Sequence, residues 1–127
     1  MSNTLVEQIL RISGEDTFSC YQCGKCSSCC PVAGEMDIVP NQMMKLVQLE
    51  DPDVVADVLS SNAPWKCTSC FNCTYVCPRE VNVAGVMEAL RLLSLRKSVN
   101  RVDLRTIKGI EEMPQILLVA AARKATG

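Results

Sequence analysis

Two groups of cysteines in this 127-residue chain share one spacing. The first group is Cys20, Cys23, Cys26 and Cys30. The second group, with each member 47 residues after its counterpart, is Cys67, Cys70, Cys73 and Cys77. Both read C-x2-C-x2-C-x3-C-P, and Pro31 and Pro78 close the two copies. Thiols at this spacing are typical of bacterial ferredoxins that hold two 4Fe–4S clusters.

The spacing also predicts which thiols share a cluster. Cysteines three residues apart on a tightly turning loop can direct three thiolates at three irons of one cubane, while the fourth cysteine reaches the other cubane. We therefore assign the first cluster to Cys20, Cys23, Cys26 and Cys77. We assign the second cluster to Cys67, Cys70, Cys73 and Cys30.

Zinc is the main alternative occupant of these thiols. Four cysteines can hold a structural zinc ion, although zinc usually takes two separated C-x2-C pairs. The absence of histidine excludes Cys/His zinc fingers and Rieske ligation. Disulfides fit poorly, because nine cysteines is an odd number. The ninth, Cys29, lies outside the pattern; we interpret it as a small thiol packed beside a cluster, with a spare-ligand or redox role as the alternative.

Helices are expected on both sides of the cysteine groups. Thr4 is a helix N-cap, Pro40 and the Asp51–Pro52 pair mark two later starts, and Asn82–Lys97 forms a longer helix. The apolar face of the first helix is Leu5, Val6, Ile9, Leu10 and Ile12. No segment alternates like a strand. The sequence therefore predicts an all-α fold, an alpha-helical ferredoxin with two 4Fe–4S clusters and a pseudo-twofold internal repeat.

The domain organisation follows from where the cysteines lie. Residues 1–97 contain both groups and form the predicted helical two-cluster ferredoxin domain. Residues 98–127 contain no cysteine but include the apolar run Ile116–Ala122. Such a run must be buried either in a core of its own or on the surface of a partner. Because the cluster module is complete by Lys97, we favour the partner and predict that residues 98–127 form a C-terminal docking extension.

Composition and motifs limit the classes of function. A net charge of −1 argues against a nucleic-acid surface. The N-terminus lacks the basic start of a signal peptide, and no apolar run approaches the roughly 20 residues that cross a bilayer, so we expect a cytoplasmic protein without direct membrane insertion. There is no dinucleotide or P-loop motif and no histidine base. With every cubane iron bound to its own thiolate, the chain is expected to be a non-catalytic electron relay.

Two stretches carry a family resemblance. They are CYQCGKCSSCCPVAGEMDIVPNQMMKLVQL and WKCTSCFNCTYVCPREVNVAGVMEALR. Their C-G-K-C core, C-P-V-A turn and W-x-C-T-x-C-x-x-C segment resemble the family of heterodisulfide reductase C subunits, over Leu5 to Arg96. The eight patterned cysteines match the ligands of that family, whereas Cys29 replaces its usual small polar residue.

The resemblance implies a role in an oxidoreductase complex. Proteins of this family carry electrons between an A-type flavin and iron–sulfur subunit and a B-type, cysteine-rich catalytic subunit. In methanogenesis the B-type subunit reduces the coenzyme M–coenzyme B heterodisulfide. The alternatives are a free-standing ferredoxin-type carrier, an iron–sulfur subunit of another dehydrogenase, and a zinc-bound structural adaptor.

Overall fold

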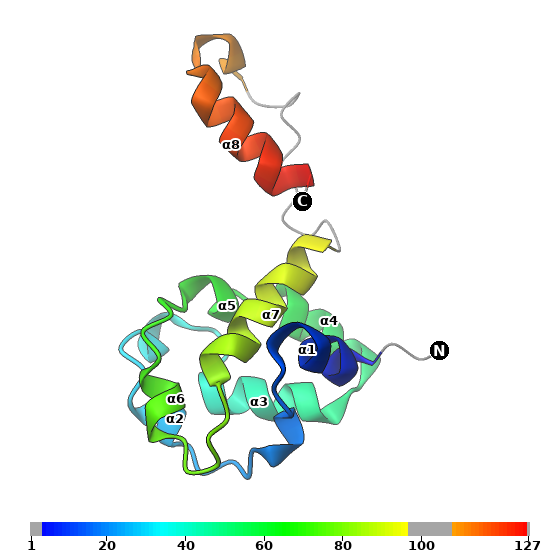
Figure 1. Ribbon diagram of the computed structural model, residues 1–127, viewed down its shortest axis with the longest axis vertical. Coiled ribbons are helices and arrows are strands. Elements are labelled where there is room, and N and C mark those ends of the chain that lie inside the picture. The colour runs from blue at the N-terminus through cyan, green and yellow to red at the C-terminus, as the bar shows by residue number, and fades with distance from the viewer. Residues whose placement is uncertain (1–3, 97–107, 127) are drawn as a thin grey trace. The chain divides into compact units, whose positions relative to one another are not determined.

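The computed structural model describes residues 4–96 and 108–126 (Figure 1). Within these ranges it contains helices and no strand, which confirms the predicted all-α fold. The chain divides into two compact units, Met1–Arg91 and Leu92–Gly127. The predicted domain boundary at Lys97 lies outside the described residues and stays a prediction.

The first helix, α1 (Leu5–Ser13), begins and ends at the residues that favour such ends. The Thr4 hydroxyl accepts a hydrogen bond from the Glu7 backbone N–H at 3.2 Å, and Gly14 ends the helix with φ +76°. The buried residues are Leu5, Val6 and Ile9. The prediction was wrong for Leu10, which is 45% exposed, because the buried face of α1 is narrower than the apolar pattern.

Two helices between the cysteine groups pack against each other and build much of the core. They are α3 (Pro40–Leu49) and α4 (Pro52–Ser60), and α1 packs against α3. Both begin with the predicted proline at the first turn, and the Asp51 carboxylate caps α4. The side chains of α3 that are fully buried are Met43, Met44 and Val47. This apolar layer supports the cysteine loops.

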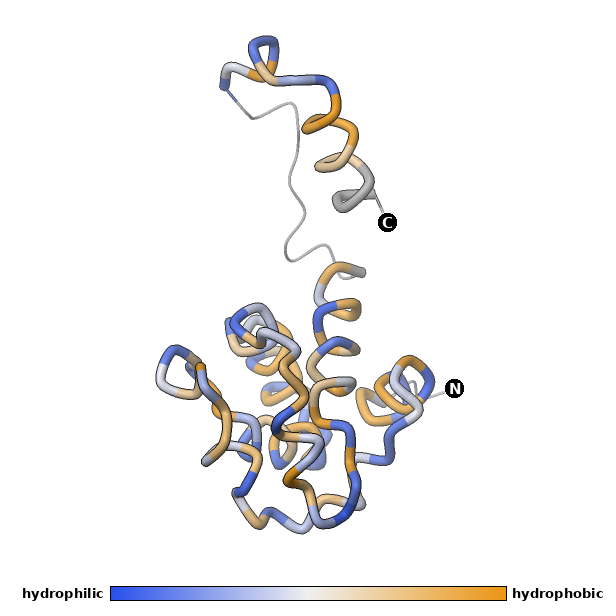
Figure 2. The backbone as a smooth tube through the Cα atoms, turned by 60° about the vertical axis from the view of Figure 1, so that its left-hand side comes forward, coloured by the Kyte–Doolittle hydropathy of each residue, from blue (hydrophilic) through white to orange (hydrophobic). Residues whose placement is uncertain are grey.

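The longest helix in the described residues, α7 (Val83–Arg96), follows the second cysteine group. Hydrophobic positions recur along it (Figure 2), and Val86, Met87 and Leu90 are buried. In the second unit, η4 (Ile110–Glu112) precedes α8 (Gln115–Thr126). The apolar run Ile116–Ala122 lies within α8, whose first turns are strongly hydrophobic (Figure 2).

Short helical turns carry the cysteine loops. In chain order they are η1 (Thr17–Ser19), α2 (Lys25–Ser28), η2 (Ala33–Glu35), α5 (Ala63–Lys66) and α6 (Asn72–Val76). Although α2 and α6 are far apart in sequence, they lie side by side (Figure 1). This pairing brings the two cysteine groups together.

Asp37 links the segment before α3 to the start of α5. Its carboxylate accepts hydrogen bonds from the backbone N–H groups of Ile38, Asn62 and Ala63 at 2.8–3.2 Å, and from the Ser61 hydroxyl at 2.7 Å. Burial raises the pKa of Asp37, but the hydrogen bonds outweigh this effect, so its pKa lies below the ordinary value.

Candidate metal centre

The first cysteine loop turns through two left-handed residues. Gln22 and Gly24 have φ angles of +66° and +79°, and they lie between Cys20 and Cys26. Glycine adopts this conformation freely, whereas glutamine does so at a cost. Left-handed residues among right-handed ones turn successive backbone N–H groups to one side, and such concave arrays bind anions. The loop is therefore suited to face an anionic group such as the sulfide of a cluster.

The second cysteine loop repeats this conformation with different residues. Ser69 and Phe71, 47 residues after Gln22 and Gly24, have φ angles of +55° and +61°. A residue other than glycine in this region costs on the order of 1–3 kcal/mol and persists where the surroundings enforce it. The repeat predicted from cysteine spacing therefore extends to the backbone.

Four cysteines from the two loops line one cavity. They are Cys20, Cys23, Cys26 and Cys77. Val81 and Val83, both buried, form an apolar part of the wall. The structure thus brings the residues predicted for the first cluster to a common site, with Cys77 reaching across the repeat. Their role as ligands stays a prediction.

Some thiols predicted for the second cluster lie close enough to one another and to the ninth cysteine for repulsion between their thiolates to raise a pKa. Cys73 interacts with Cys67 and Cys29. Cys29 in turn interacts with Cys30 and Cys70. Cys29 therefore lies near residues of the second set, but its thiol also donates to the Cys26 carbonyl of the first loop, and Cys26 in turn interacts with Cys73.

Each cysteine loop is tied to the long helix that follows it. In the first half the Ser27 hydroxyl donates to the Asn41 side-chain oxygen in the first turn of α3. In the second half the Thr74 hydroxyl donates to the side-chain oxygen of Asn82, at 3.0 Å, just before α7. Ser27 and Thr74 each directly follow the third cysteine of their group. In both halves, the hydroxyl after the third cysteine therefore ties the loop to an asparagine at the start of the following long helix.

A glutamine holds the start of the first loop. The side-chain amide of Gln48, on α3, donates to the carbonyl oxygens of Thr17 at 2.8 Å and Cys20 at 3.0 Å. Because one amide bridges two carbonyls, it fixes the turn that presents the first predicted ligand. The sequence analysis did not identify this residue.

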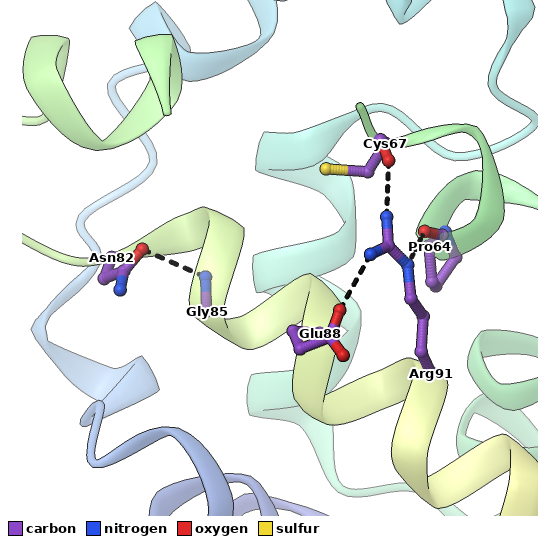
Figure 3. A network of polar contacts seen from close by, with 6 residues as sticks. All are labelled: Pro64, Cys67, Asn82, Gly85, Glu88 and Arg91. Atoms are coloured by element: carbon purple, nitrogen blue, oxygen red, sulfur yellow. Dashed lines mark hydrogen bonds and ion pairs between the residues drawn. The ribbon is translucent and has the colours of Figure 1, made fainter. Parts of the chain in front are cut away.

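An arginine occupies the equivalent place in the second half (Figure 3). The guanidinium of Arg91, on α7, donates to the carbonyl oxygens of Pro64 and Cys67, which follow Thr17 and Cys20 by 47 residues. It also forms an ion pair with the Glu88 carboxylate at 2.7 Å. Each half therefore uses one side chain to bridge the first cysteine and the residue three positions before it.

Comparison with known proteins decides the family. A family model described as a 4Fe-4S dicluster domain matches residues 16–81, which is just over half of the chain and includes all eight patterned cysteines. The chain belongs to the 4Fe-4S dicluster domain family. This membership and the donor set of thiols mark an iron–sulfur protein.

Curated relatives of this dicluster protein bear the names that the resemblance predicted. The chain is 31% identical over 107 residues to the C subunit of ferredoxin:CoB-CoM heterodisulfide reductase of Methanosarcina mazei, covering 84% of this chain and 63% of the relative. It is 31% identical over 99 residues to the second iron-sulfur C subunit of CoB--CoM heterodisulfide reductase of Methanocaldococcus jannaschii, covering 75% and 51%. A protein of Archaeoglobus profundus that is named as similar to the heterodisulfide reductase C subunit is 28% identical and aligns with the whole chain, covering 68% of its own length.

These relatives confirm the predicted resemblance to the family of heterodisulfide reductase C subunits. The chain spans about half to two thirds of the length of the curated relatives it matches. In the part of the chain that the structure describes, no helix is long and apolar enough to cross a membrane.

Three thiols of this dicluster protein lie in surroundings that favour their protonated form. Burial raises the pKa of Cys26 to about 11, although hydrogen bonds from Ser27 oppose the shift. Burial likewise raises the pKa of Cys73 and of Cys29, whose thiol donates to the Cys26 carbonyl at 3.4 Å. Metal ligation requires thiolates, so bound iron would have to supply the charge that displaces these protons. Thiol donors, left-handed loops and an apolar wall together fit an iron–sulfur cluster.

Proposed function

We propose that this chain is the electron-transfer subunit of a heterodisulfide reductase-like complex and holds two 4Fe–4S clusters. The first would be held by Cys20, Cys23, Cys26 and Cys77. The second would be held by Cys67, Cys70, Cys73 and Cys30. The observation that carries the proposal is the cavity in which Cys77 joins three cysteines of the first loop.

The residues around the thiols suit electron transfer. When bound, the clusters supply one-electron oxidation and reduction without a change in covalent bonds. The chain contributes rigid loops, fixed by Gln48 and Arg91, and a buried apolar wall from Val81 and Val83. Because close-packed side chains rearrange little when a cluster gains an electron, such surroundings favour electron transfer. The chain offers no histidine base, so we assign it no catalytic residue.

The names of the relatives suggest the partners. They are subunits of CoB-CoM heterodisulfide reductases. We infer a cytoplasmic complex in which this chain relays electrons between an A-type flavin and iron–sulfur subunit and a B-type, cysteine-rich subunit that reduces the disulfide. The coenzyme M–coenzyme B heterodisulfide is the proposed substrate of the whole complex.

Native mass spectrometry of the anaerobically purified complex tests this function. We expect the chain to be bound to a larger cysteine-rich subunit and to carry about eight irons with equal acid-labile sulfide. A clustered chain that is always monomeric in native extracts would contradict the complex and favour a free carrier. Zinc without iron or sulfide would contradict the clusters and favour a structural adaptor.

A further inference from the structure

The two halves of the site fix their first cysteine in the same way but with different charge. Gln48 and Arg91 each bridge the carbonyl of that cysteine and the carbonyl three residues earlier. The glutamine amide is neutral, whereas the guanidinium of arginine keeps its positive charge at any pH that a protein meets. Arg91 therefore places a permanent positive charge against the start of the second loop. The equivalent side chain at the first loop, Gln48, is uncharged.

The surroundings of Arg91 allow its charge to act on the loop. Its side chain is only 18% exposed, and two of its hydrogen bonds go directly to backbone of the Pro64–Cys67 turn. Charges that are partly buried are screened less by water and salt than exposed ones. Reduction adds one negative charge to a cluster, so a nearby cation favours the reduced form and raises the potential.

We propose that Arg91 is a positioning residue that raises the midpoint potential of the cluster bound by the Cys67 loop above that of the cluster bound by the Cys20 loop. The inference rests on the proposed clusters and adds an order between them. A single electron on the chain is then expected to reside on the cluster beside Arg91.

Other groups near the two loops act on the same balance. Lys25 directly precedes Cys26 and Lys66 directly precedes Cys67, so each loop carries one exposed lysine and these two charges favour neither cluster. Glu88 pairs with Arg91, but its side chain is 54% exposed, so water screens the carboxylate more than the guanidinium. On the side of the first loop, the exposed Arg79 donates to the Ser19 carbonyl at 3.2 Å. Gln22 donates to the Cys20 sulfur at 3.4 Å without adding charge. Arg91 is less exposed than Arg79, Lys25 or Lys66 and makes two contacts with the backbone of its loop, so we expect its effect to be the largest.

Redox titration of the anaerobic full-length chain, followed by EPR, tests the proposal. Arg91→Gln keeps hydrogen-bond donors but removes the charge, and we expect the midpoint potential of the Cys67-loop cluster alone to fall. A shift of about 59 mV, which is a tenfold change in the ratio of reduced to oxidised cluster at a fixed potential, is the expected size for a one-electron couple. Arg91→Lys should retain most of the parent potential, because it keeps the charge. Glu88→Gln should shift the same cluster in the opposite direction.

Matched variants identify the clusters and control for general effects. Cys20→Ser and Cys67→Ser, made singly, alter the signal of one cluster each and so assign the two signals. Arg79→Gln removes the exposed cation near the first loop and should shift the first cluster by less than Arg91→Gln shifts the second. Gln48→Ala loosens the first loop without a change of charge and should leave the Cys67-loop cluster at its parent potential.

Several results would overturn the proposal. If Arg91→Gln left both potentials unchanged, or moved them equally, Arg91 would have only a structural role. The same conclusion would follow if Arg91→Lys and Arg91→Gln gave equal shifts, or if Arg79→Gln had the larger effect. If the parent chain gives two EPR signals and the Arg91 variants do not change either midpoint potential, the proposed order of the two potentials is refuted and the proposed function is not. A parent chain without iron refutes the proposed function.

Discussion

Cys77 belongs to the second half of the sequence but lines the cavity of the first cysteine loop. We therefore expect Cys77→Ser to weaken the cluster near Cys20, because that cluster loses a thiolate, while the cluster in the Cys67 loop keeps all four. The measurement is EPR of the reduced variant together with iron and sulfide analysis.

The ninth cysteine provides the control for that variant. Cys29 interacts with residues of the second set but lies outside the ligand pattern, so Cys29→Ser should keep the iron content and both signals. Damage confined to the Cys67-loop signal in Cys77→Ser would show that each group of four cysteines binds its own cluster.

Asp37 gives a prediction about acid stability. Its pKa lies below the ordinary value because its hydrogen bonds outweigh its burial. A carboxyl with a depressed folded pKa stabilises the fold above its unfolded pKa of about 3.9, and the contribution is lost as the pH falls through the lower folded value. Asp37→Ala should therefore reduce the free energy of unfolding at pH 7 by about 1 kcal/mol, since it removes several hydrogen bonds but water screens the exposed carboxylate.

Anaerobic denaturant titrations of the parent chain and the Asp37→Ala variant at pH 7 and at low pH measure this effect. The difference between them should shrink as the pH falls. Asp53→Ala is a matched control, because Asp53 is an exposed carboxylate in the first turn of α4 and makes no part of the Asp37 network. A difference that does not change with pH would show that the ionised form of Asp37 is not the stabilising one.

Residue identity indicated the candidate ligands, but it did not indicate the groups that hold the loops. Cysteine is rare and its spacing is local, so the eight thiols could be read from the sequence. Gln48 and Arg91 act on backbone carbonyls far away in the sequence, and nothing in a single sequence marks which carbonyl a side chain will meet. The two residues do share a position in their helices. Gln48 lies eight residues after Pro40, the first residue of α3, and Arg91 lies eight residues after Val83, the first residue of α7.

At the scale of helices, α7 depends on a cap that also contacts the second loop. The Asn82 side-chain oxygen accepts from the Gly85 backbone N–H and from the Thr74 hydroxyl, both at 3.0 Å (Figure 3 shows the first contact). Asn82→Ala removes both and should lower the free energy of unfolding by about 1–2 kcal/mol. Thermal unfolding of the anaerobic protein, followed by loss of cluster absorbance, measures the change.

A serine at position 82 tests whether capping of α7 is the source of the stability that Asn82 provides. Serine is also a good N-cap, so Asn82→Ser should recover much of the stability lost in Asn82→Ala. If both variants unfolded at the same temperature, the hydrogen bond to Gly85 would not be the source of the stability.

Helix starts were predictable where a capping residue or proline precedes an apolar pattern. Thr4, Pro40, Asp51 and Asn82 all mark observed starts. The short helices α2, α5 and α6 were not predicted, because four or five residues are too few to show periodicity. The left-handed conformation of Phe71 was also hidden, since tertiary contacts rather than its own preference must enforce it.

At the scale of the molecule, the two compact units suggest separate tasks. The eight patterned cysteines lie in Met1–Arg91, whereas Ile116, Leu117 and Val119 of α8 are exposed apolar residues in the other unit. We predict that a chain ending at Lys97 keeps its iron and both EPR signals but no longer co-purifies with its partner subunits.

Iron analysis and affinity purification of the shortened chain beside the full chain provide the test. Ile116→Asp is the milder variant, because it alters the exposed face of α8 and leaves the chain at full length. Normal complex formation by both altered chains would show that residues 98–127 are not the docking extension.

The crosswise cavity also has a consequence for how the protein is made. Its last cysteine is encoded 51 residues after Cys26, and a ribosome adds about 5–20 residues per second. For several seconds of synthesis the nascent chain exposes three thiols of the first set without their fourth. On the proposed ligand assignment, we expect the first cluster to be completed only after translation of Cys77, and the earlier thiols to benefit from protection against oxidants or stray metal until that moment.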